Sequence, residues 1–147
     1  MQREDYLLRM IAQMGRVLAA IRRMLLEGKN SAAGDELERA AQQGGIDLRL
    51  VLALDEPSLE PLLRTGGEID RPKCAFLAEV LYLEWRRQLA MGRIPQAERC
   101  ARRALLLYAL AYDFIVMDDE TRKRIAELEG DIEPGELRDE ASTTGGG

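Results

Sequence analysis

Arginines near residue 92, at a predicted turn, form the densest group of side chains that could do chemistry. The group consists of Arg86, Arg87, Arg93, Arg99, Arg102 and Arg103. Only Glu84 and Glu98 lie among them, so the segment carries excess positive charge. Guanidinium groups bind carboxylates and phosphates through paired hydrogen bonds. Arg99, Arg102 and Arg103 could therefore hold an acidic peptide, a phosphate backbone or the acidic C-terminal segment of the same chain. A solvated helical surface is the plainer interpretation.

The residues needed for most enzyme mechanisms are missing from the sequence. The chain has no histidine, which excludes Ser-His-Asp and Cys-His triads, histidine-liganded zinc and histidine pH switches. Cys74 and Cys100 do not form a CxxC motif. Gly66 and Gly67 are not followed by the Lys-Ser/Thr pair of a phosphate-binding loop. We therefore predict a protein that is not an enzyme and that has no catalytic residues, no cofactor and no metal.

The chain of 147 residues is long enough to bury one hydrophobic core, and 46% of its residues are hydrophobic. Apolar residues recur at helical spacing along most of its length. Helices are expected over residues 4–27, 32–43, 46–54, 57–63, 70–91, 96–117 and 119–129, several of them separated by glycines. Since no segment requires a strand, the sequence predicts an all-α fold, a compact helical bundle or array.

The first predicted helix, residues 4–27, has a wide apolar face. Its main stripe consists of Leu7, Ile11, Met14, Leu18, Ile21 and Leu25, and a second stripe consists of Met10, Val17 and Met24. A face of this width favours packing within the chain over the narrow seam of a dimeric coiled coil. A homo-oligomeric seam stays open as an alternative. Attachment to a membrane surface is disfavoured because no large aromatic anchor accompanies the basic side of this helix.

The end of the chain is acidic, with ten acidic against four basic residues from Asp118 onward. The net charge of −5 therefore belongs mainly to this segment. This acidic composition, together with Gly130, Pro134 and a closing run of glycines, predicts one helical domain over residues 1–130 and a disordered, flexible tail over residues 131–147. No apolar signal segment opens the sequence and no apolar run reaches membrane-spanning length, so we expect a cytoplasmic protein.

Residues 72–117 resemble a tetratricopeptide repeat, a hairpin of two antiparallel helices. Gly92, Ala97 and Ala104 stand at the turn glycine and at the two small positions of the second helix, where the helices approach closely. Three positions depart from the family pattern: Trp85, Gln88 and Ala109. A generic helical hairpin is the alternative. The resemblance implies that neighbouring helices cover the hairpin, because one repeat cannot bury its own face.

The opening residues also carry a resemblance. Asp5-Tyr6, followed two residues later by Arg9-Met10-Ile11, is similar to the start of an uncharacterised family of small bacterial helical proteins. Members of that family pair such an N-terminal helix with a repeat-like C-terminal hairpin. The resemblance therefore implies the same architecture over most of the chain and implies no particular reaction.

The repeat-like register implies a binding surface on the first helix of the hairpin, lined by Glu79, Tyr82, Arg86 and Leu89. Tyr82 and Arg86 are four residues apart and share a helical face, and Tyr and Arg are typical of interface hot spots. We predict a non-catalytic module that binds a protein or peptide partner there. An accessory or self-associating subunit of a larger assembly is the alternative. Nucleic acid is disfavoured because neither a helix-turn-helix pattern nor stacking aromatics accompany the arginines.

Overall fold

The computed structural model describes the backbone of residues 2–112 and 118–145, and the side chains of Arg9 and of residues 12–112 and 118–132. Its longer helices are α1 (Gln2–Leu26), α2 (Asn30–Gln43), α5 (Arg71–Ala90), α6 (Ile94–Leu110) and α7 (Asp119–Gly145). Between α2 and α5 lie α3 (Leu48–Ala53), α4 (Glu56–Leu59), the 3₁₀ helix η1 (Glu60–Leu63) and the strands β1 (Arg64–Thr65) and β2 (Glu68–Ile69). The all-α prediction is confirmed.

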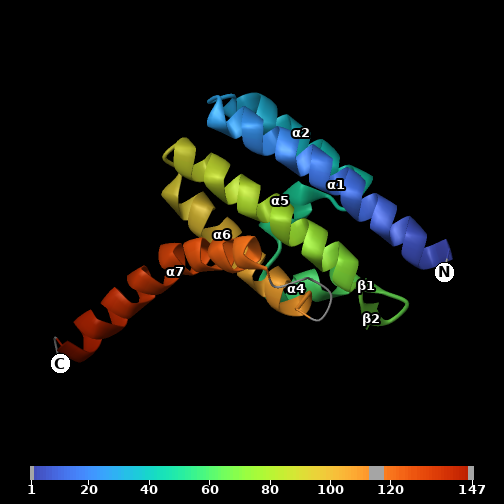
Figure 1. The fold of residues 1–147 in the computed structure, drawn as a ribbon. Helices are drawn as coiled ribbons and strands as arrows, with labels where there is room; N and C mark the ends of the chain where they lie inside the picture. The colour runs from blue at the N-terminus through green and yellow to red at the C-terminus, as the bar shows by residue number, and fades with distance from the viewer. Residues whose placement is uncertain (1, 113–117, 146–147) are drawn as a thin grey trace.

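Two antiparallel helical hairpins, α1 with α2 and α5 with α6, form the body of the molecule (Figure 1). Helix α5 packs against both helices of the first hairpin and runs parallel to α1 (Figure 1). Both hairpins turn at a glycine with positive φ, Gly28 at 77° and Gly92 at 72°. The amide of Arg93 donates to the Gln88 carbonyl, as expected where a left-handed glycine ends a helix. The sequence therefore placed both turns correctly.

The segment between the hairpins contains a small β-hairpin that the sequence did not predict. β1 and β2 pair in antiparallel fashion, with Arg64 opposite Ile69 and Thr65 opposite Glu68. Gly66 and Gly67 form the two-residue turn with φ values of 63° and 85°. Consecutive glycines with positive φ favour a turn whose twist matches that of paired strands. The expected loop is therefore a minimal hairpin, and the expectation that no strand is needed was wrong at this point.

Helix α5 lies at the centre of the hydrophobic core and is buried on most of its sides. Leu77 and Leu81 of α5 are fully buried, and they share one core cluster with buried residues of the other elements, among them Ile21, Leu37, Val51, Leu63, Leu107 and Leu128. Full burial of a leucine is worth about 1.5–3 kcal/mol. Because one core receives side chains from both hairpins and from α7, these elements belong to one packed unit.

Helix α7 is longer than the sequence predicted. Its expected end lay near Glu129, but its backbone stays helical to Gly145. A helix passes through Pro134 at the cost of one backbone hydrogen bond and local crowding, so such a residue does not always end it. The packed side chains reach Ile132, beyond the expected boundary at residue 130. Figure 1 shows the first part of α7 against α6 and the rest extending away from the body.

The predicted extension of the preceding helix to Met117 also differs from the structure, in which α6 ends at Leu110. Residues 113–117, the last part of that predicted helix, lie outside the described part of the chain. Helix α7 begins with a defined cap, because the Asp118 carboxylate accepts a hydrogen bond from the Thr121 amide at 2.8 Å. This hydrogen bond lowers the pKa of Asp118. The carboxylate therefore stabilises the start of the helix in its ionised form.

Candidate functional site

A row of polar side-chain pairs joins α5 to α7, and we call it the ladder. Its members are Glu79, Tyr82, Trp85 and Arg86 of α5 and Arg124, Glu127 and Asp131 of α7. Arg124 donates to Glu79 at 3.0 Å, and the Tyr82 hydroxyl donates to Glu127 at 3.0 Å. The Trp85 indole N–H donates to Asp131, also at 3.0 Å. Each pair joins residues at least 45 positions apart, so the ladder is tertiary structure.

The order of the pairs gives the direction of α7. Glu79, Tyr82 and Trp85 meet Arg124, Glu127 and Asp131 respectively, so residue numbers rise together along both helices. Helix α7 therefore runs parallel to α5, as α5 runs parallel to α1 (Figure 1). Beside the polar residues, α7 presents an apolar stripe to the core: Ile125, Leu128 and Ile132. Both stripes have spacings of three and then four residues, which keeps each on one helical face.

Tyr82 is the centre of the ladder. Its side chain is only 2% exposed, and its hydroxyl also accepts a hydrogen bond from Arg86 at 3.0 Å. The guanidinium carbons of Arg86 and Arg124 lie 5.8 and 6.0 Å from the ring centroid, within cation–π range. Burial raises the pKa of Tyr82 despite the nearby Arg86. The phenol therefore stays neutral at physiological pH and donates a hydrogen bond to the Glu127 carboxylate.

Part of the contact between α7 and the α5–α6 hairpin is polar but incompletely paired. The Tyr108 hydroxyl of α6 and the Arg124 Nε are buried, and neither makes a hydrogen bond of ordinary geometry, although Tyr108 lies beside Arg124 and Glu79. Burial raises the pKa of Tyr108, which keeps this phenol neutral. A buried polar group without a partner costs free energy. The docking of α7 is therefore specific but carries two unpaired atoms.

The structure brings together three of the four residues predicted on the first helix of the hairpin. Glu79, Tyr82 and Arg86 lie on one face of α5, as their spacing indicated. Helix α7 covers this face, so the expected open surface is occupied by the same chain. Leu89 instead packs against the hydrophobic core. Sequence reasoning missed Trp85, Glu127 and Asp131, although the matched spacing of Arg124, Glu127 and Asp131 in an otherwise charged helix was a visible signal.

The predicted arginine cluster does not converge on one surface site. Arg103 is buried and donates to the backbone carbonyls of Val51, at 3.0 Å, and Leu54. Arg99 donates to the Leu52 carbonyl at 3.3 Å. These carbonyls lie at the C-terminal end of α3, where cations satisfy unpaired acceptors and the helix dipole. Arg99 and Arg103 therefore fix α3 to α6.

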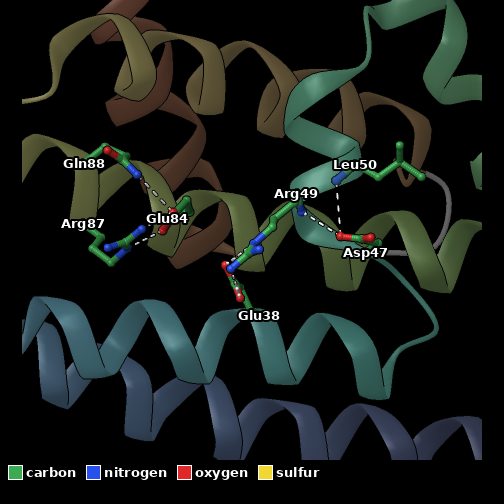
Figure 2. Close-up of polar contacts among 7 residues, drawn as sticks. All are labelled: Glu38, Asp47, Arg49, Leu50, Glu84, Arg87 and Gln88. Carbon is green, nitrogen blue, oxygen red and sulfur yellow. Dashed lines mark hydrogen bonds and ion pairs between the residues drawn. The ribbon is translucent and has the colours of Figure 1, made fainter.

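Two more arginines of the cluster, Arg87 and Arg102, also have partners within the chain. Arg102 forms an ion pair with Glu98 one turn earlier, at 3.0 Å. Arg87 is paired with Glu84, which is 3% exposed and accepts from its Nε and Nη2 at 2.5 and 2.8 Å. Gln88 donates to the same carboxylate at 3.2 Å (Figure 2). The positive charge counted from the sequence is therefore partly neutralised inside the fold.

Gly34 explains how the Arg87 side chain fits between α2 and α5. A Cβ atom at this position would lie 2.8 Å from the Arg87 guanidinium carbon, which is too close. The hydrogen bonds that Arg87 donates to Glu84 raise the pKa of Arg87 and keep its guanidinium charged.

Near the Arg87–Glu84 pair, Arg49 of α3 donates to Glu38 of α2 at 3.1 Å (Figure 2). Asp47 caps α3 by accepting from the Arg49 and Leu50 amides (Figure 2). The Arg49–Glu38 contact joins α3 to α2, and the Arg87–Glu84 pair lies between α2 and α5.

The two thiols are buried and separate. Burial raises the pKa of Cys74 to about 11 and that of Cys100 to about 12, so both stay protonated at neutral pH. Among the described side chains, those of Arg9 and of residues 12–112 and 118–132, no three cysteines, aspartates or glutamates are grouped so that they could hold a metal ion. In the same part of the chain, no helix combines the length and apolar character needed to cross a membrane.

Comparison of the chain with protein-family models, with curated proteins and with solved structures found no match. The resemblance of residues 72–117 to a tetratricopeptide repeat and the resemblance of the opening residues to a bacterial helical family stay predictions. The functional interpretation therefore depends on the contacts of the described residues, above all on those of the ladder.

Proposed function

We propose that this protein is a non-catalytic interaction module whose α5–α6 hairpin binds a helical segment of a protein partner. The observation that carries the proposal is the ladder, in which α5 holds a helix in one register through three side-chain pairs. Tyr82, Trp85 and Arg86 are the residue types that dominate the energetics of protein interfaces. They lie together on one helix beside a buried apolar strip that receives α7.

The arrangement of the helices supports a repeat-like module. In a helical array each hairpin covers the next one, and a last helix covers the terminal hairpin. Helix α5 packs on α1 and α2, and α7 packs on α6 of the second hairpin. The order of the ladder pairs makes α7 parallel to α5. A helix from a partner can take the position of α7 because the recognition elements belong to α5 and α6. Both cysteines are free thiols in this fold, which suits the reducing cytoplasm, where we place the protein.

Helix binding by this face is tested with a peptide in trans. The probe is a fluorescent synthetic peptide of residues 118–137, and the receptor is the full chain with Leu128→Ala. Leu128 is fully buried on α7, so its truncation weakens docking of the chain's own helix without altering α5. Leu37→Ala is the matched control because Leu37 is equally buried but lies on α2. Trp85, the single tryptophan, reports by its emission whether α7 has left.

The expected result is saturable binding of the peptide to the Leu128→Ala chain, with weaker binding to the Leu37→Ala chain. Adding Arg86→Ala to the Leu128→Ala chain should weaken the binding by up to about 1 kcal/mol, the contribution of a partly exposed ion pair. The proposal is wrong if Trp85 emission shows that α7 has left and the peptide still does not bind.

Self-association through α1 is a second candidate. Leu26, at the end of α1, is 74% exposed, and Met14, Val17 and Leu18 are only partly buried against the core. A second copy would cover these side chains. Sedimentation at two protein concentrations a hundredfold apart tests this candidate. A mass that doubles with concentration supports it, and a monomer at both concentrations contradicts it.

A further inference from the structure

The residues of α7 define the kind of helix that the α5–α6 face can recognise. Trp85 offers an indole N–H, and Tyr82 and Arg86 offer a hydroxyl and a guanidinium that both face the Glu127 carboxylate. Donors of this kind select acceptors, and carboxylates are the strongest acceptors among side chains. The two carboxylates that they hold on α7 are four residues apart. The face therefore favours two acids with this spacing.

The remaining contacts add a basic residue and an apolar stripe to the pattern. Glu79 is the one acid of the ladder on α5, and it pairs with Arg124, which lies three residues before Glu127, the first ladder acid of α7. Ile125, Leu128 and Ile132 follow the same spacing on the adjoining side. The complete pattern is a base, an acid three residues later and another acid four residues after that, with an apolar residue directly after each of the three.

Helix α7 is held in a way that allows replacement. Arg86 and Glu127 lie 3.8 Å apart with side chains 39% and 33% exposed, so water and salt reach this pair. The Tyr108 hydroxyl and the Arg124 Nε are buried without a hydrogen bond of ordinary geometry. Of these two, only the Tyr108 hydroxyl belongs to the receiving face, and a competing helix that supplies it with a hydrogen-bond partner gains an advantage over α7. The intramolecular helix keeps the advantage of a high effective concentration, which an external helix must overcome.

We propose that the α5–α6 face binds an acidic amphipathic helix of a partner protein, and that α7 occupies the face by imitating that helix until the partner displaces it. This inference rests on the proposed helix-binding function and specifies its partner and its regulation. The contact of α7 is autoinhibitory in this account. Partner affinity therefore depends on how firmly α7 is docked.

The test uses the full chain in two forms and three synthetic peptides of residues 118–137. The chains are the unaltered protein and the Glu127→Gln/Asp131→Asn variant, in which α7 loses both acids of the ladder. The peptides are the unaltered sequence, the same double substitution, and Glu129→Gln as the control. The Glu129→Gln substitution removes one acid from the same helix, at a position that does not belong to the ladder. Binding is measured by fluorescence anisotropy at two salt concentrations, and circular dichroism verifies the fold of each chain.

We expect the unaltered and control peptides to bind the double-variant chain roughly tenfold more tightly than the unaltered chain, because loss of a charge-assisted hydrogen bond releases α7. The doubly substituted peptide should bind roughly tenfold more weakly than the control peptide. If the double variant does not fold, Glu127→Gln alone replaces it, with a smaller gain.

Two results would overturn the proposal in different ways. Equal binding of all peptides to both chains would show that the face binds helices without selecting acids or being blocked by α7, which contradicts this inference and leaves the proposed function intact. Failure of every peptide to bind either chain, while Trp85 emission shows that α7 of the variant has left, would contradict the proposed function and this inference with it.

Discussion

The hydroxyl of Tyr82 provides the sharpest energetic test of how α7 is held. It donates to Glu127 at 3.0 Å, across 45 residues of sequence. A hydrogen bond to a charged acceptor contributes about 1.5–3 kcal/mol when it is buried. Solvent reduces this value because a third of the Glu127 side chain is exposed. We therefore expect a coupling free energy of about 0.5–1.5 kcal/mol between the Tyr82 hydroxyl and the Glu127 carboxylate.

The coupling is measured with a double-mutant cycle on the full chain. Tyr82→Phe removes the hydroxyl but keeps the ring, and Glu127→Gln removes the charge but keeps the shape of the side chain. Urea unfolding of the four proteins gives the coupling free energy. The cycle of Tyr82→Phe with Glu129→Gln is the control and should give no coupling beyond about 0.3 kcal/mol. Equal values from both cycles would refute the placement of α7 on α5.

Three further predictions concern the core, the arginines and the thiols. Leu128→Ala should lower the free energy of unfolding by about 2–5 kcal/mol in urea melts, because Leu128 is fully buried. Arg103→Met should cost about 2–4 kcal/mol because it removes two hydrogen bonds to carbonyls of the α3 segment, whereas Arg102→Met on the half-exposed ion pair should cost less than about 1 kcal/mol. The free energy of unfolding should fall as the pH rises from 9 towards 11, because the thiols ionise near pH 9 in the unfolded chain whereas burial keeps Cys74 and Cys100 protonated in the fold. Chemical denaturation at each pH measures this decrease. The Cys74→Ala/Cys100→Ala variant should not show the part of the decrease that the thiols cause.

Local features of the fold could be predicted from the sequence because short-range physics determines them. Gly28 and Gly92 end helices through a left-handed conformation that other residues rarely adopt. The period of apolar residues indicated which residues of α2 and α6 face inward, Leu37 and Ala104 among them. The common face of Glu79, Tyr82 and Arg86 followed from the same period.

The parts that could not be predicted depend on contacts between distant residues. Nothing local to Tyr82 indicates that Glu127 will cover it, because the pairing depends on how α7 returns to the hairpin. The sequence places Arg103 on a charged surface because other arginines lie close to it in the chain, and the carbonyls that it binds in the fold lie about 50 residues earlier. The continuation of α7 past Pro134 was also missed, because sequence signals for helix ends are preferences with exceptions.

Nuclear magnetic resonance of the Trp85 indole N–H tests directly whether α7 is docked on the α5–α6 face. The indole N–H gives one signal because the chain has one tryptophan. This group donates to Asp131 of α7 at 3.0 Å, and Trp85 is buried. If α7 is docked as described, the proton exchanges slowly with water, and Asp131→Asn shifts its resonance while Glu129→Gln does not. A rapidly exchanging indole proton whose resonance is unchanged by Asp131→Asn would contradict the claim that the α5–α6 face holds a helix.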